Sequence, residues 1–248
     1  MESPKNKRNL RRFFPLSTLL GLFVLLPAPA NALTISTING TWSSVVDGLN
    51  VTFQTVGDEN QVRWGIDTGA GQSGLGFAGN TTPLSFGLDE AFAIGTFRHF
   101  NKPIGSGSAA TAADLTIGFN FSDPSGLVFS PSFTFAINET PNPTDPCPAG
   151  DPLCDDIISF PSSLPVESFI IGSTTYTLQI LGFGTDPSGP FAQEFVSAEN
   201  SINSIQIFGQ ISAGSPVPEP ASLLLLSSGM IGLGLLLWRK KQGELEGK

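Results

Sequence analysis

The fold of this chain is best read from one stretch in its middle, Leu115-Thr116-Ile117-Gly118-Phe119-Asn120-Phe121. Large apolar side chains occupy every second position of this stretch, with small or polar residues between them. Successive side chains of a β-strand point to opposite faces, so the apolar set would cover a core while Thr116 faces outward. The stretch therefore predicts a strand that is buried on one face.

The same period of two recurs along the chain in Phe133/Phe135/Ile137, Tyr176/Leu178/Ile180 and Ile205/Ile207/Ile211. Glycine, proline, asparagine and aspartate separate these runs, as is typical of short strands joined by turns. Further strands are expected within Thr34–Trp42, Leu49–Val56, Gln61–Ile66, Leu84–Leu88 and Ala91–Phe97. About ten strands and no long amphipathic helix predict an all-β fold, an antiparallel β-sandwich or jelly roll.

The charges are divided unevenly along the 248 residues, whose formal net charge is −9. Between Leu33 and Pro220 there are 3 Lys and Arg against 18 Asp and Glu, which gives this part a formal charge of −15. Such a surface is repelled by phosphates, so nucleic acid is excluded as a partner. It could attract cations or basic partners, or serve solubility alone.

Residues 1–32 have the three parts of a secretory signal peptide. A basic start is followed by the apolar run Phe13–Leu26 and the small-residue site Ala30-Asn31-Ala32. We expect a signal helix, cleavage after Ala32 and a mature chain that begins at Leu33. The leucine-rich run favours the general secretory route, and the pair Arg11-Arg12 leaves the twin-arginine route open.

The other end of the chain, residues 215–248, has the composition of a membrane anchor. It contains Val217-Pro218-Glu219-Pro220, the uncharged run Ala221–Trp238 and the basic cluster Arg239–Lys241. A helix over 221–238 would span ~27 Å, close to the ~30 Å core of a bilayer. The basic cluster places its end on the cytoplasmic side. Residues 33–214 are then the exported ectodomain.

The order of these three parts resembles the PEP-CTERM sorting signal of bacterial surface proteins. The resemblance implies recognition of Val217, Pro218, Glu219 and Pro220 by an exosortase, a membrane transpeptidase, and an association with exopolysaccharide production. It further implies an inner-membrane intermediate with its ectodomain outside, and a final location at the cell surface or in the extracellular matrix. The alternative is an ordinary single-span anchor.

The stretch Thr140–Asp156 contains five prolines and both cysteines of the chain, Cys147 and Cys154. In an oxidising compartment these two can pair only with each other, so we predict a structural disulfide. Their spacing matches neither a zinc site nor a Cys-x-x-Cys redox pair. Calcium remains an alternative, since oxygen ligands could come from Asp145, Asp151, Asp155 and Asp156. Otherwise no cofactor or metal is expected.

The only histidine lies in Arg98-His99-Phe100-Asn101. This segment resembles the Thr-His-x-Asn motif of the THxN, or choice-of-anchor, family, although its first position departs from the pattern. Asn60–Gly65 resembles that family's Arg-Trp-Gly stretch. The resemblance implies a β-rich exported domain over 33–214 and supplies no activity. His99 and Asn101 share a strand face by parity, and Lys102-Pro103 should end the strand. A structural role, ligand binding and catalysis all remain open for them.

Three functions are compatible with these features. The first, which we expect, is a non-enzymatic envelope or matrix protein. The second is a carbohydrate-binding module, which requires exposed aromatic residues such as Trp42, Trp64 or Tyr176. The third is a glycoside hydrolase, which requires two carboxylic acids at a suitable separation.

Overall fold

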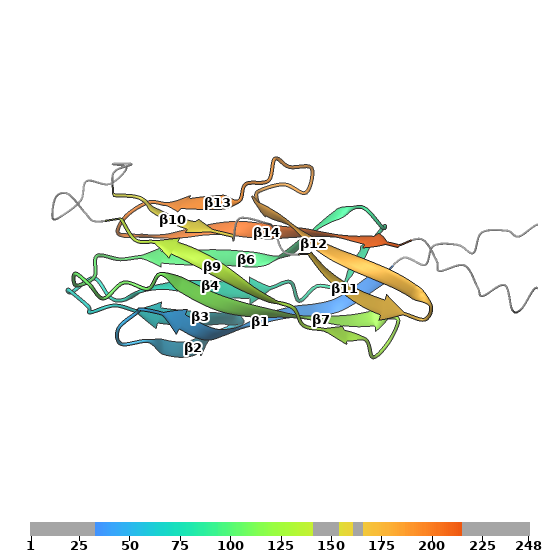
Figure 1. Cartoon of the computed structure of the whole chain (residues 1–248), viewed down its shortest axis with the longest axis horizontal. Coiled ribbons are helices and arrows are strands. Elements are labelled where there is room, and N and C mark those ends of the chain that lie inside the picture. Colours follow the sequence, from blue (N-terminus) through green and yellow to red (C-terminus); the bar gives the residue numbers. More distant parts are fainter. Residues whose placement is uncertain (1–32, 141–153, 161–165, 215–248) are drawn as a thin grey trace, which may run out of the picture. The chain divides into compact units, whose positions relative to one another are not determined.

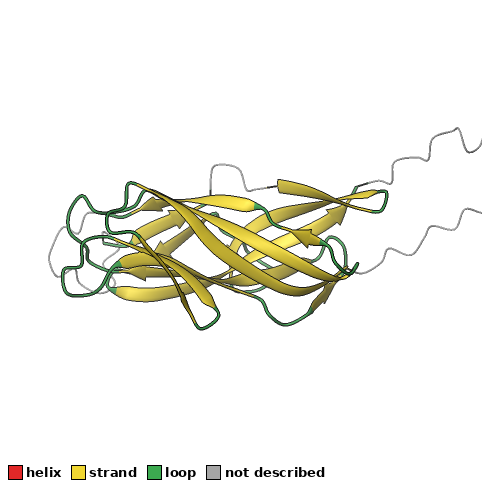
Figure 2. Ribbon diagram, turned by 90° about the horizontal axis from the view of Figure 1, so that it is seen from below, coloured by secondary structure: helices red, strands yellow, loops and turns green. Residues whose placement is uncertain are grey.

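The computed structural model describes residues 33–140, 154–160 and 166–214. Every element of regular secondary structure in this part of the chain is a β-strand, as Figure 2 shows. The expected signal helix within 1–32 and the transmembrane helix over 221–238 lie outside the described residues. No helix long and apolar enough to cross a membrane occurs among the residues that are described.

The first sheet, sheet A, is antiparallel and has the strand order β13-β10-β9-β7-β1-β5, with β8 paired to β7 (Figure 1). Its central pair joins β1 to β7 over ten aligned positions, from Thr34 opposite Asp123 to Val46 opposite Ala112. The strands of sheet A are β1 (Leu33–Val46), β5 (Leu84–Phe86), β7 (Ala112–Asp123), β8 (Val128–Phe129), β9 (Ser132–Asn138), β10 (Asp156–Ser159) and β13 (Glu194–Ser197).

The second sheet, sheet B, is also antiparallel and has the order β11-β12-β14-β6-β4-β3-β2. Its centre is β6, which pairs with β14 on one side and with β4 on the other. The strands of sheet B are β2 (Thr52–Val56), β3 (Glu59–Trp64), β4 (Ser73–Gly79), β6 (Ala91–Asn101), β11 (Val166–Ile171), β12 (Thr174–Gly184) and β14 (Ser201–Ala213).

The two sheets bury their apolar faces against each other. Phe97 of sheet B lies at the centre, with ring centroids 6.1 Å from Trp42, 4.9 Å from Phe135 and 5.3 Å from Phe183. Trp42 and Phe135 belong to sheet A, so this aromatic cluster spans both layers. Aromatic pairs at such separations contribute about 0.5–1.5 kcal/mol each beyond the area that they bury. The predicted β-sandwich is therefore confirmed for the described residues.

The predicted alternation is clearest in β7. Leu115, Ile117, Phe119 and Phe121 are all at most 4% exposed, whereas Thr116 is half-buried on the other face. In β14 the alternation shifts, because the pairing with β6 contains an irregularity between Ile207 and Phe208. Both of these residues are consequently buried, where a strict period of two would place one of them outside.

Every run predicted as a strand contains one in the structure. Five strands were not predicted: β4, β8, β10, β11 and β13. The strand β6 ends at Asn101, immediately before Lys102-Pro103, as expected. In the segment 105–111 that connects β6 to β7, Ser108 and Ala110 are buried.

Candidate functional site

The residues singled out from sequence fall into three groups. The sorting motif Val217–Pro220 and Cys147 lie outside the described residues. Cys154 is described and fully buried. Because its expected partner Cys147 is not described, the disulfide stays a prediction. Arg98, His99 and Asn101 lie on β6, at its C-terminal end.

Strand parity separates the side chains at this end of β6. His99 and Asn101 are both 0% exposed and lie on the interior side of sheet B. Arg98 points to the other side, where its guanidinium forms a 2.7 Å ion pair with Glu59 of β3. Phe100 lies on that outer side too, beneath the guanidinium of Arg63, which is 3.3 Å from the ring centroid.

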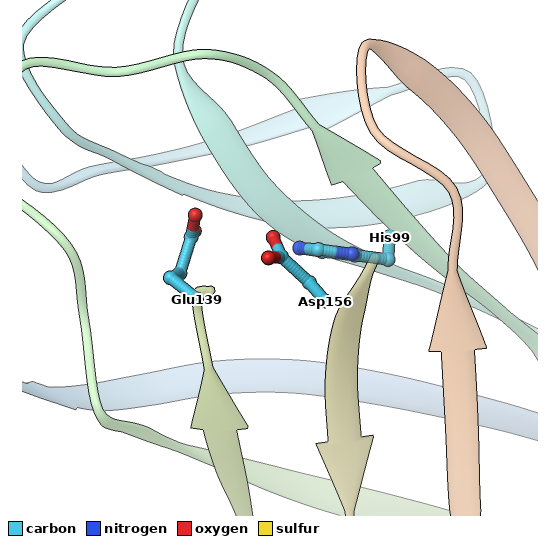
Figure 3. Close-up of side chains that lie close together, drawn as sticks. All are labelled: His99, Glu139 and Asp156. Atoms are coloured by element: carbon cyan, nitrogen blue, oxygen red, sulfur yellow. The ribbon is translucent and has the colours of Figure 1, made fainter. Parts of the chain in front are cut away.

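His99 faces two acidic residues of sheet A (Figure 3). Asp156 is the first residue of β10, and Glu139 directly follows β9. One ligand atom from each of His99, Glu139 and Asp156 lies within 4.8 Å of those of the other two. In Figure 3 the Asp156 carboxylate lies between the Glu139 carboxylate and the imidazole ring. Three strands from two sheets thus meet at one cluster, which we call the His-Glu-Asp cluster.

Each acid of the cluster is held by a neighbouring donor. The indole Nε1–H of Trp64 donates to Glu139 Oε1 at 2.9 Å. The backbone N–H of Thr140 donates to Asp156 Oδ1 at 2.8 Å, and the Thr140 hydroxyl donates to the same oxygen at 3.3 Å. Both carboxylates are therefore fixed in orientation by groups outside the cluster.

Burial and mutual repulsion shift the titration of these groups. Burial, followed by the negative charge of Glu139, raises the pKa of Asp156 to about 8. Burial also raises the pKa of Glu139, with a contribution from the charge of Glu199. Burial and then the positive charge of Arg63 lower the pKa of His99 to about 3, so its imidazole is neutral.

Asn101 extends the cluster toward β13. Its side-chain Nδ2 donates to the backbone carbonyl of Ser197 at 2.9 Å and so ties β6 to sheet A. Glu199, which is 8% exposed, follows in the connection between β13 and β14. The charge of Glu199 acts on both Glu139 and Asp156. The end of the sandwich therefore gathers two acids beside one neutral histidine, with the charge of Glu199 acting on both acids.

This arrangement has donor atoms that could hold a metal ion. The calcium alternative proposed from sequence had included Asp156, whereas Asp145 and Asp151 lie outside the described residues and Asp155 is not in the His-Glu-Asp cluster. Glu139 was missed by sequence reasoning. It is a single acid after a strand, and no local pattern connects it to His99.

The hydrolase alternative requires two acids that converge in an open cleft. Glu139 and Asp156 do converge, with one carboxylate oxygen of each within 4.8 Å of the other. Asp156 is only 1% exposed, however, so this pair does not line an open cleft. Two pockets in the described part of the chain have other linings, one around Arg63 and Lys102 and one around Thr41 and Phe53.

The aromatic residues named for a carbohydrate platform do not form one. Trp42 is 5% exposed and Trp64 is 0% exposed. Tyr176 is half-buried and stacks on Phe169, with 5.6 Å between the ring centroids. All three residues contribute to the packing of the sandwich, so a glycan would have to bind elsewhere.

Comparison with known proteins identifies the C-terminal segment. Residues 216–241 match the family described as the PEP-CTERM protein-sorting motif. The match includes Val217–Pro220, the apolar run 221–238 and the basic cluster 239–241. No curated protein matches the chain. The resemblance of 33–214 to the THxN family gains no support from these comparisons and stays a prediction.

The matched segment defines a class of protein rather than an individual one. A PEP-CTERM motif implies sorting by an exosortase system, through an exported and membrane-anchored intermediate at the cell surface. The part of the chain that precedes this motif is an all-β sandwich. The chain thus combines an all-β sandwich with a C-terminal PEP-CTERM sorting motif.

Proposed function

We propose that this protein is a non-enzymatic component of the cell envelope or extracellular matrix that an exosortase delivers and processes. The match of residues 216–241 to the sorting motif carries the proposal. A membrane anchor alone needs only the apolar run and the basic stop, so Pro-Glu-Pro before them indicates recognition by a processing enzyme. Association with exopolysaccharide is part of the proposal and follows from the resemblance of the signal.

Replacing Pro218, Glu219 and Pro220 together by Ala tests this function in the native host. The apolar run and its basic flank are unchanged in this variant, so membrane insertion should persist while processing fails. The variant should accumulate in the membrane fraction with residues 221–238 attached. The parent protein should appear at the surface or in the matrix without them.

A matched control is the triple replacement of Gln242, Gly243 and Glu244 by Ala. It also changes three residues and removes one carboxylate, but it lies beyond the matched segment 216–241. This control should be processed like the parent. Equal processing of the Pro218/Glu219/Pro220 variant would show that these residues are not the recognition signal, and retention of residues 221–238 in the parent would show that the segment is a permanent anchor.

Glycan binding is a second candidate function, favoured by a pocket on the outer face of sheet B. The residues around it that can hydrogen-bond are Thr52, Gln54, Arg63, Gln72 and Lys102. Arg63 and Lys102 are two of only three cations between Leu33 and Pro220. Their gathering at one pocket of an acidic domain suits an anionic polysaccharide, such as one containing uronic acids.

Co-sedimentation with polygalacturonate, at several salt concentrations, tests this second function. The protein should bind in low salt and dissociate as salt is added, and Lys102→Ala should weaken binding severalfold. A neutral glucan serves as the control ligand. Binding that is unaffected by Lys102→Ala, or equal for both glycans, would rule out this pocket.

A further inference from the structure

The His-Glu-Asp cluster contains polar atoms whose hydrogen-bonding needs the fold does not meet. Both ring nitrogens of His99 are buried without a hydrogen-bond partner, as are Asn101 Oδ1 and Asp156 Oδ2. Leaving a buried polar atom unpaired costs about 1–3 kcal/mol, so several such atoms at one place require an explanation. His99 is 0% exposed, which leaves its nitrogens no access to bulk water.

The charges around Asp156 point to a missing positive partner. Its carboxyl group lies beside the acid Glu139, and the ion pair found among the described residues, Arg98 with Glu59, does not involve it. Arg63, the cation that acts on His99, has its guanidinium over Phe100 on the other side of sheet B. Buried carboxylates are normally paired with a cation or bound to a metal.

We propose that His99, Glu139 and Asp156 bind one divalent transition-metal ion, with Zn²⁺ as the best fit. A ligand set of one imidazole nitrogen and two carboxylate oxygens suits Zn²⁺ and related first-row ions, whereas Ca²⁺ prefers oxygen ligands throughout. The proposal does not depend on how the protein is sorted.

The geometry fits such an ion. Zinc lies ~2.0–2.2 Å from nitrogen and oxygen ligands, which places the ligand atoms of one ion about 3–4 Å apart. The three donor atoms already lie within 4.8 Å of one another, so side-chain movements that bring them about 1–2 Å closer would complete the site. Asn101 Oδ1, also buried and unpaired, is a candidate fourth ligand.

The groups behind the ligands are those of a metal site as well. Carboxylate ligands are commonly oriented by hydrogen bonds from a second layer of residues. Trp64 supplies such a bond to Glu139, and Thr140 supplies one to Asp156. Because His99 belongs to sheet B while Asp156 belongs to sheet A, the ion would fasten the two layers of the sandwich at this end.

Zinc titration of the full-length protein, purified in detergent and treated with EDTA, tests the proposal. Calorimetry should show one Zn²⁺ per chain, with Ca²⁺ and Mg²⁺ binding at least tenfold more weakly. The midpoint of thermal unfolding should rise by about 5–10 °C when free Zn²⁺ is a hundred times its dissociation constant. A wild-type protein that binds no Zn²⁺, or that prefers Ca²⁺, would overturn the proposal.

Asp156→Asn is the most informative variant, because its effect on stability should reverse with the metal. Without metal it replaces a buried carboxyl group beside two other acids by a neutral amide of the same shape, so its midpoint should equal or exceed that of the wild type. With Zn²⁺ it should gain little stability, and its dissociation constant should be at least tenfold higher. Glu167→Gln, at an exposed acid on β11, is the matched control and should bind like the wild type.

His99→Phe provides an independent check. The aromatic ring fills much of the same space but has no nitrogen, so the folded variant should lose Zn²⁺ binding. Trp64 fluorescence offers a readout in the unmodified protein, since Zn²⁺ on Glu139 alters the acceptor of the indole N–H. A change that EDTA reverses, and that Trp64→Phe abolishes, supports the site. Unaltered binding in both Asp156→Asn and His99→Phe would contradict it.

Discussion

At the scale of single residues, two of the few cations of the β-sandwich, Arg63 and Arg98, belong to one polar network around Glu59. Arg98 pairs with Glu59, whose side chain is only 5% exposed. Gln61 Nε2 donates to the other carboxylate oxygen of Glu59 at 2.6 Å. Arg63 in turn donates through Nε and Nη2 to Gln61 Oε1, at 3.1 and 3.0 Å. A buried acid on β3 is thus satisfied by a short polar network.

Arg98→Met should destabilise the protein by removing the guanidinium that forms a direct ion pair with Glu59. Breaking a buried ion pair costs ~3–5 kcal/mol, but Arg98 is 36% exposed, so we expect about 1–2 kcal/mol. Urea denaturation measures the loss. Adding Glu59→Gln should recover most of it, because the uncompensated charge disappears. A double variant no more stable than Arg98→Met would show that the charge is not the cause.

The His-Glu-Asp cluster shows which parts of a site a sequence reveals. Parity on β6 predicted that His99 and Asn101 share a face, and both are buried together. Their partners Glu139 and Asp156 come from other strands, and only the pairing of β9 with β10 and the packing of the sheets bring them close. Local pattern determines which way a side chain faces. Long-range topology determines what it meets.

At the scale of elements, β4 explains why some strands escape prediction. Its sequence, Ser73-Gly-Leu-Gly-Phe-Ala-Gly79, contains three glycines, and glycine disfavours strands. The structure nevertheless requires them, because a Cβ on Gly74 would lie 2.3 Å from the Val62 carbonyl and one on Gly79 would lie 2.0 Å from the Ile38 carbonyl. The residues that weaken the strand signal are those that allow β4 to pack closely.

The long alternating strands, by contrast, were predictable because one buried face imposes a period of two on the sequence. The short strands β8, β10, β11 and β13 offer too few positions to show that period. Their pairing depends on neighbours already in place, such as β9 for β10.

Gly79→Ala should therefore destabilise the sandwich at the place where β1 approaches β4. There the Ile38 N–H donates to the Asn80 carbonyl at 2.8 Å, so neither backbone can move away freely. Overpacking of this kind costs about 1–3 kcal/mol, and calorimetric unfolding should show a lower midpoint. Gly57→Asn is the control. Its φ of +66° suits Asn, and a Cβ there meets nothing within 4 Å. Equal midpoints for both variants would contradict the close approach.

The predicted disulfide belongs to the segment between β9 and β10. Cys154 is fully buried two residues before β10 begins. Mass spectrometry of exported protein without reduction should show Cys147 bonded to Cys154. Closing so short a loop stabilises by ~2–3 kcal/mol at most, so reduction should lower the unfolding midpoint modestly. Two freely alkylated thiols in exported protein would exclude the bond.

At the scale of the whole molecule, the chain contains a folded domain and a sorting motif. The domain is a two-sheet sandwich whose core joins both layers into one hydrophobic cluster. The sorting motif is the segment 216–241. The motif implies sorting by an exosortase system, and the proposed function rests on it.

The intact mass of the protein isolated from the surface or matrix of its native host tests this account most directly. Cleavage after Ala32 should make Leu33, the first residue of β1, the start of the mature chain. Processing by an exosortase should remove the apolar run 221–238, so the measured mass should correspond to a chain that begins at Leu33 and ends before this run. A mass that includes residues 221–238 in the surface-located protein would contradict sorting by cleavage and identify the segment as a permanent anchor.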